Sequence, residues 1–145
     1  MEFMTKLQAW FISIFGAVGA LIVQLFGGWT KDLNTLIIFM AIDFCMGLII
    51  AGVFKKSTKT DGGALSSEAC FKGLCKKGVA LLIVLVANQL DVVMGVDYIR
   101  SAVIIAFLVN ETISIIELAG IIGIPIPPVI TKAIEVLKAK SDKEE

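Results

Sequence analysis

The chain has no histidine among its 145 residues, and this absence removes several kinds of chemistry at once. Histidine is the usual general base near neutral pH and the commonest protein ligand for metals. Without it, the serine–histidine and cysteine–histidine pairs that activate nucleophiles cannot form. The three cysteines give no even set of disulfides and are too few for a four-ligand zinc site. The G-x-x-x-x-G-K-[ST] and G-x-S-x-G motifs are absent too. We therefore expect no enzyme activity, no metal site and no cofactor.

Net charge is also lacking, because 13 basic residues balance 13 acidic ones, so nothing in the bulk charge points to a nucleic-acid partner. What the chain does have is apolar surface, with 57% hydrophobic residues and a mean hydropathy of +0.91. Soluble domains contain about 45–50% apolar residues. A chain this short buries only about two-thirds of its surface on folding. The composition therefore predicts an integral membrane protein with a single domain, 1–145.

Four apolar runs cover residues 7–28, 33–54, 79–96 and 99–124. Each is about long enough to cross a ~30 Å hydrocarbon core as a helix. The runs predict an all-α membrane fold of four transmembrane helices in two hairpins. The prolines at 125, 127 and 128 end the fourth run, and an apolar stripe opposite charged residues then predicts a surface helix over 128–138. We expect the charged tail, 139–145, to be disordered.

Between the hairpins lies a polar segment, 55–78, which we predict to be a cytoplasmic loop. Eleven of the 13 basic residues fall in this loop or near the two chain ends, on one side of the predicted membrane. Such a bias is typical of the cytoplasmic side. Both chain ends are therefore expected in the cytoplasm. The basic residues of the loop are Lys55, Lys56, Lys59, Lys72, Lys76 and Lys77.

Polar side chains interrupt the runs, and each carboxylate among them costs roughly 2.5–3.5 kcal/mol at the centre of a membrane helix. We place Lys77 in the loop and Arg100 outside the membrane, so we expect no basic side chain to neutralise these acids. They would be protonated, hydrogen-bonded to a neighbour or facing water. Two roles stay open for them. They could stabilise contacts between helices inside the bundle, or they could line a pore built from several copies. The polar set is Asp43, Asn88, Asp91, Asn110, Glu111, Ser114 and Glu117.

Small residues spaced four apart occur in the first two runs, at Gly16 and Ala20 and at Gly47 and Ala51. Pairs of this kind let membrane helices approach closely. We predict that these four residues mediate helix packing.

Three stretches carry a resemblance to a known family. The first, Asp43-Phe44-Cys45-Met46-Gly47, places an acid before a glycine in the second span. The second, residues 65–77, reads LSSEACFKGLCKK, and the third, residues 110–127, reads NETISIIELAGIIGIPIP. From about residue 33 to 137 the chain resembles the phage lysis and toxin-secretion holin family. It departs from the family at Cys70, where a glycine is expected, and at Leu118, where an asparagine is usual.

The resemblance implies a protein that accumulates in the bacterial cytoplasmic membrane, oligomerises and opens lesions. Its partners would be membrane lipids, further copies of itself, and an endolysin or large toxin that the lesions release. On this basis we hypothesise that the third and fourth spans face the lumen of the lesion. Three alternatives stay open: a small oligomeric cation or proton channel or transporter, a membrane scaffold, and an antiholin that restrains lysis.

Overall fold

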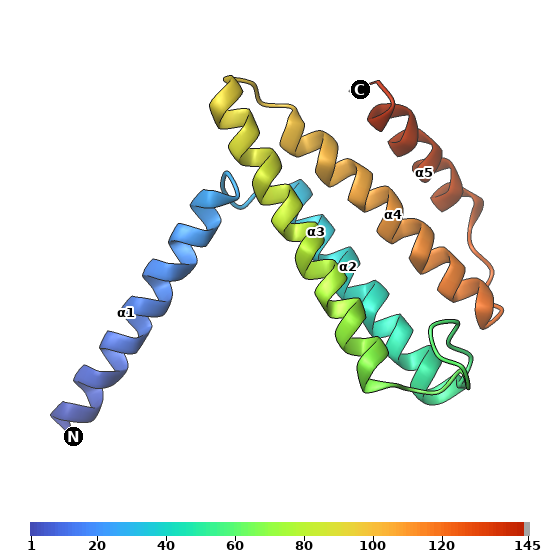
Figure 1. The fold of residues 1–145 in the computed structure, drawn as a ribbon, viewed down its shortest axis with the longest axis horizontal. Helices are drawn as coiled ribbons and strands as arrows, with labels where there is room; N and C mark the ends of the chain where they lie inside the picture. Colours follow the sequence, from blue (N-terminus) through green and yellow to red (C-terminus); the bar gives the residue numbers. More distant parts are fainter. Residues whose placement is uncertain (144–145) are drawn as a thin grey trace.

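The computed structural model describes residues 1–143, and over that range it contains helices and no strand (Figure 1). The elements in chain order are α1 (Glu2–Leu25), α2 (Lys31–Ile49), the π-helical η1 (Ile50–Phe54), α3 (Ser67–Met94), α4 (Ile99–Ile121) and α5 (Pro128–Ser141). Among the described residues, four helices, with η1 counted as the end of α2, are long and apolar enough to cross a membrane. The expected all-α fold with four candidate spans is confirmed. The two-hairpin topology with both ends inside stays a prediction.

Helix α3 begins twelve residues earlier than the apolar run that predicted it, at Ser67 instead of residue 79. The hydroxyl of Ser66 accepts the backbone N–H of Ala69 at 3.4 Å, and Glu68 lies in the first turn, where an acid suits the helix dipole. Residues 67–78, which we expected in the loop, are therefore helical. The loop itself is confined to residues 55–66, because hydropathy locates the apolar part of a helix and not its first hydrogen-bonded turn.

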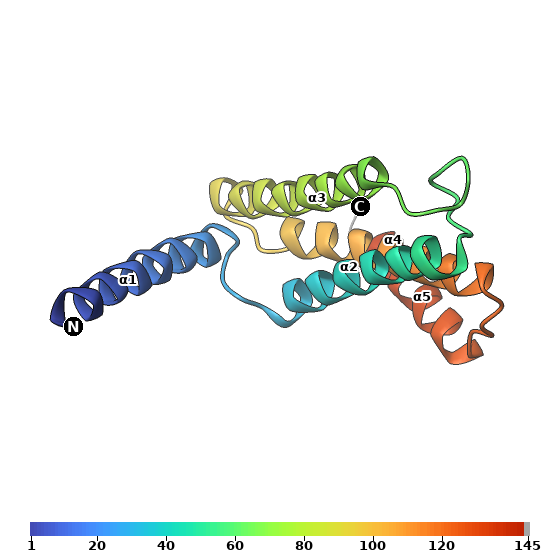
Figure 2. The same ribbon diagram turned by 90° about the horizontal axis from the view of Figure 1, so that it is seen from below.

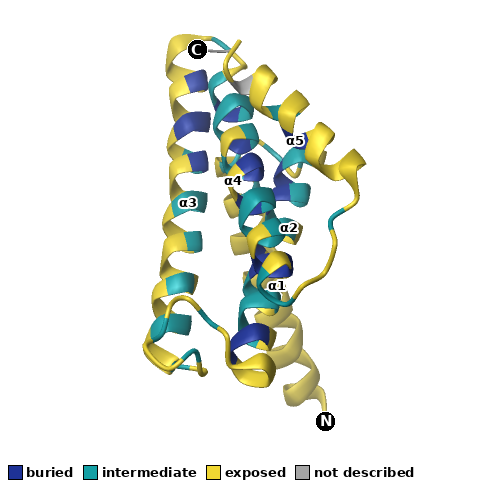
Figure 3. Ribbon diagram, turned by 90° about the vertical axis from the view of Figure 1, so that its right-hand side faces the viewer, coloured by how far each residue is buried: buried dark blue, intermediate teal, exposed yellow. Residues whose placement is uncertain are grey.

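Helices α2, α3 and α4 form a three-helix bundle, in which they lie side by side (Figures 1 and 2). Buried residues gather where these helices face each other, and the outward faces are exposed (Figure 3). Membrane helices associate through close packing and polar contacts, because lipid tails are as apolar as their side chains. The packed centre consists of Leu33, Leu36, Met40, Val84, Ile104 and Leu108.

Helix α1 diverges from the bundle and has no buried residue (Figure 1). It contacts α3 and leads to α2 through Gly27 and Gly28, whose φ angles of 80° and 94° favour glycine. A Cβ at Gly27 would overlap the side-chain amide of Asn88. Nothing lies within 4 Å of a Cβ added at Gly16. The packing role of the small face on α1 therefore stays a prediction.

Helix α5 folds back beside α4 (Figures 1 and 2) and buries Ile134. It begins at Pro128, a residue suited to the first helical turn, and extends to Ser141. Residues 139–141, which we expected in a disordered tail, are thus helical, because lysine and alanine continue the helix well. Glu144 and Glu145 lie outside the described residues. The location of α5 at a membrane surface stays a prediction.

Candidate functional site

A lysine bridges two carboxylates inside the bundle. The Nζ atom of Lys77 lies 2.8 Å from Oδ2 of Asp43 and 2.6 Å from Oε2 of Glu111. These three side chains come from α3, α2 and α4, and their exposed fractions are only 15%, 6% and 9%. The hydroxyl of Ser114 also donates a hydrogen bond to Oδ1 of Asp43, at 2.5 Å. We call Asp43, Lys77 and Glu111 the charge bridge.

The early start of α3 explains how a lysine reaches this position. Lys77 follows Ser67 by ten residues, or about 15 Å of helix, which carries it from the loop to the middle of the bundle. Our expectation that no basic side chain neutralises the intramembrane acids is therefore wrong. Removing one partner from a buried ion pair costs roughly 3–5 kcal/mol, because the other charge stays buried without compensation. The bridge is therefore a strong constraint on the three helices.

A cleft of about 290 Å³ connects the charge bridge with the polar loop. Small residues form much of its walls, with Gly47 and Ala51 on the α2–η1 side and Gly73 on α3. Its loop end includes Lys59, and its inner end reaches the charge bridge and Asn110. The two small residues that we predicted to pack helices on the second span thus border this cleft, although Ala51 is itself buried, and their packing role stays a prediction. The cleft gives the buried charges a path toward the loop.

A second polar cluster, at the opposite end of the bundle, joins the two interhelical turns. The side chain of Arg100, itself buried, donates from Nε to the carbonyl of Phe26 at 2.6 Å and from Nη2 to the hydroxyl of Thr30 at 2.7 Å. Its Nη1 atom lies 3.7 Å from a carboxylate oxygen of Asp32. The first turn of α4 therefore holds the turn between α1 and α2.

Two of the predicted polar residues belong to this cluster. The carboxylate of Asp91 accepts the backbone N–H groups of Ile99 and Arg100, both at 2.9 Å. An acid that accepts the free N–H groups of a helix start compensates its own burial. Asn88 donates to the carbonyl of Leu25 at 2.9 Å. We call Asn88, Asp91 and Arg100 the turn clamp.

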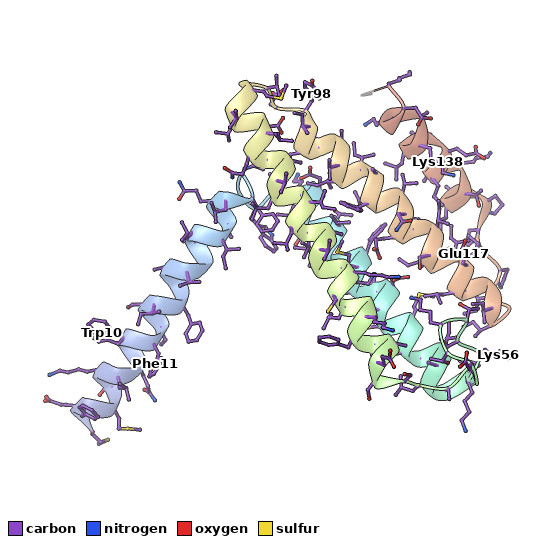
Figure 4. The ribbon with its side chains drawn as sticks, in the orientation of Figure 1. Trp10, Phe11, Lys56, Tyr98, Glu117 and Lys138 are labelled. Atoms are coloured by element: carbon purple, nitrogen blue, oxygen red, sulfur yellow. The ribbon has the colours of Figure 1, made fainter. Side chains whose placement is uncertain are left out.

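The structure thus divides the predicted polar set into three groups. Asp43, Glu111 and Ser114 meet at the charge bridge, and Asn88 and Asp91 lie in the turn clamp. Asn110 is exposed on α4, as is Glu117 (Figure 4), and neither side chain makes a hydrogen bond within residues 1–143. The lumen-facing role of the whole set stays a prediction.

The lysines of the predicted loop divide as well. Lys55 lies exposed just after η1, next to the exposed Lys56 (Figure 4). Lys59 and Lys76 border the cleft. Lys72 pairs with Glu68 at 2.6 Å on the exposed side of α3.

Sequence reasoning missed the two basic residues that organise the interior, Lys77 and Arg100. A signal for the first was present, since Ser66 followed by Glu68 is typical of a helix start. Nothing local marks Arg100, because the partners of its side chain lie 68 to 74 residues earlier in the chain.

Comparisons with known proteins give one family and several relatives of similar length. A model of the bacteriophage holin family matches residues 20–139. A probable holin of Bacillus phage phi105 is 30% identical over 118 residues, which are 81% of this chain and 82% of the phage protein. An uncharacterized protein of Listeria monocytogenes is 35% identical over 128 residues, 88% of this chain and 86% of the relative. One from Clostridium perfringens is 30% identical over 131 residues, 86% of this chain and 88% of the relative. No solved structure matches.

Proposed function

Since the chain belongs to the bacteriophage holin family, as its resemblance predicted, we propose that it gathers as homo-oligomers in the bacterial cytoplasmic membrane and opens lesions there. Holin membership and the four apolar helices make it a multi-pass membrane protein. The proposed lesions release a cytoplasmic endolysin or a large toxin and so lead to lysis or export.

The observation that carries this proposal is the exposed polar face of α4. Asn110 and Glu117 are seven residues apart, so they lie two turns from each other on one side of the helix. A carboxylate on a membrane span is costly against lipid, and such residues almost always face a bundle interior or water. In one copy Glu117 has neither, and Asn110 lies only at the edge of the cleft. Contact between copies, or a water-filled lumen bordered by α4, supplies the missing environment.

The packing of one copy also favours a lesion built from many copies. The three packed helices of one copy meet at side chains such as Leu36 and Ile104, which are fully buried. A folded enzyme needs a hole far wider than any channel through such a packed centre. Many copies must therefore surround a lesion that passes folded protein. The small face of α1, at Gly16 and Ala20, is a contact between copies in this arrangement.

Orientation in the membrane follows from the basic residues. The proposed topology puts ten of the 13 basic residues, all except Lys31, Lys77 and Arg100, on the side of the loop and of both chain ends. We place this side in the cytoplasm. In the structure α5 lies against α4 with its last turn toward the α3–α4 turn (Figures 1 and 3), so this topology requires α5 to leave α4 and lie at the cytoplasmic surface, where Lys138 and Lys140 would reach the anionic headgroups.

Timed loss of membrane integrity tests the proposal. The chain is expressed in a bacterial host with and without a cytoplasmic endolysin, and growth, dye entry and membrane levels of the protein are followed. We expect abrupt arrest of growth in both strains and lysis only with the endolysin. Continued growth with an intact membrane, despite normal insertion, contradicts the holin role and favours an antiholin or a scaffold.

The charge bridge and its cleft favour one second candidate, a small cation or proton channel. Buried acids that a cleft connects with water are typical of ion pathways in membrane proteins. Purified protein in liposomes separates the two functions. Passage of small cations without release of an enclosed folded protein favours the channel, and release of the folded protein favours the holin.

A further inference from the structure

We infer that the charge bridge holds each copy closed, and that its release frees the first half of α3 from α2 and α4 when lesions open. The inference rests on the proposed function and assigns to one contact the control of that function. Three features of the molecule support it.

The first feature is how little else holds this part of α3. Residues 67–76 contain no buried residue, and the first buried residue of α3 is Val84. The cleft separates Ala69, Cys70 and Gly73 of α3 from α2 and η1. Apolar packing therefore begins only after Lys77. Within residues 1–143, the hydrogen bonds that join residues 67–80 to α2 and α4 all come from the ammonium of Lys77.

The second feature is the sign of the interaction. With Lys77 in place, two carboxylates are drawn toward one ammonium between them. Without it, Asp43 and Glu111 remain as two neighbouring acids in a weakly polar interior. Like charges at such a site repel, and the medium between them screens this repulsion far less than bulk water does. Loss of one contact therefore changes attraction among three helices into repulsion between two of them.

The third feature is access. The cleft extends from the charge bridge to loop residues that include Ser57 and Thr60. Water and small ions can therefore reach the ammonium and both carboxylates from the side that we place in the cytoplasm. Water entering the cleft would weaken the bridge, because it hydrates the same groups that the bridge pairs. The contact is strong while the cleft stays narrow and weak once it widens, so opening is cooperative.

The native thiol of Cys70 reports on this part of the structure, because it borders the cleft and is only partly exposed. In a chain with Cys45→Ser and Cys75→Ser, a membrane-impermeant maleimide added to inside-out vesicles reacts at Cys70 alone. We expect Lys77→Met to raise the rate of labelling at least about tenfold, by moving most copies into the open conformation. Lys72→Met is the matched control, since it removes the same charge from the exposed side of the same helix. It should leave the rate unchanged.

A charge exchange separates the bridge from a general loss of stability. The double variant Asp43→Lys with Lys77→Asp keeps one base and two acids at the site. We expect it to return the labelling rate to that of the parent chain, although Asp43→Lys alone raises it. Equal labelling in Lys77→Met and the parent, at equal membrane levels, overturns the inference. Failure of the exchange to lower the rate overturns it as well.

The parent chain gives a test that needs no substitution at the bridge. In cells that lyse, labelling of Cys70 by a membrane-permeant maleimide, in the chain with Cys45→Ser and Cys75→Ser, should rise at the onset of lysis, and a constant rate through onset overturns the inference. Failure of the proposed function has a different signature. Cells then never lyse, while the contrast between Lys77→Met and Lys72→Met in vesicles still decides whether the bridge holds the cleft closed.

Discussion

The carboxylate of Asp91 accepts the backbone N–H of Arg100 at 2.9 Å. The side chain of that same arginine reaches back to the carbonyl of Phe26 and the hydroxyl of Thr30. One residue is therefore fixed by α3 through its backbone and holds the α1–α2 turn through its guanidinium. The geometry makes the position of α1 depend on the start of α4.

Replacing Arg100 with leucine should loosen the α1–α2 turn. The carbonyl of Phe26 and the hydroxyl of Thr30 lose their donor, and we expect the protein to lose about 1–3 kcal/mol of stability. Denaturation of the purified protein in detergent measures the loss, and protease cutting near the turn should become faster. Lys31→Met, at an exposed lysine of the same turn, is the control. Equal stability of the two variants would contradict the clamp.

Replacing Asp91 with leucine should lower the amount of folded protein before it affects lysis. From sequence alone Asp91 is a candidate for the lumen, but in this structure it caps α4. Loss of a cap costs about 0.5–2 kcal/mol. Asp91→Asn keeps one acceptor oxygen and should lose less. Membrane levels and unfolding in detergent measure both variants. If Asp91→Leu is as stable as the parent and yet fails to lyse cells, the result supports a role for Asp91 in the lumen and contradicts its role as the cap of α4.

Glu117→Leu and Asn110→Leu should behave in the opposite way. Both side chains are exposed and make no internal hydrogen bond among the described residues, so each variant should insert and accumulate normally. We expect the onset of lysis to be delayed or abolished, because the polar face of α4 is lost. The onset time at matched membrane levels is the measurement, with Ile116→Leu on the same helix as control. A normal onset time of lysis in both variants would contradict the proposal that α4 borders the lumen.

Two neighbouring glycines allow a paired test of the α1–α2 turn. Both have positive φ, and a left-handed conformation costs an alanine roughly 1–2 kcal/mol. Only at Gly27 would the added Cβ also overlap Asn88. Gly27→Ala should therefore destabilise the protein more than Gly28→Ala, and the difference reports the contact between the turn and α3. Unfolding of both variants in detergent measures it, and equal losses would argue against that contact.

Sequence patterns located the four helices because each contains a long apolar run, which a membrane span requires. They also marked Asp43 and Glu111, because acids are rare in such runs. The bridge between them could not be predicted in the same way. It depends on the register of three helices, and the lysine that forms it sits among charged neighbours that resemble a loop. Recognising the helix start at Ser66 would have moved Lys77 into the span.

The turn clamp could not be predicted from the sequence either, but for a different reason. Arg100 stands one residue after the predicted start of a span, where a basic residue normally faces water or headgroups. Its burial follows from partners in the α1–α2 turn, on α2 and on α3, and no local pattern encodes contacts over such distances. The divergence of α1 likewise reflects an absence of contacts that apolar composition does not reveal.

The turn clamp also sets an order of events during synthesis. Arg100 follows Phe26 by 74 residues, so at roughly 5–20 residues per second the ribosome reaches it about 4–15 s later. Until then the first two helices lie in the membrane without the hydrogen bonds that Arg100 donates to the turn between them. The first hairpin therefore matures only after the second has begun to form. A nascent chain released before residue 100 would insert its helices without the hydrogen bonds that Arg100 makes to the α1–α2 turn. Such a truncated protein would therefore not adopt the native arrangement of α1 and α2.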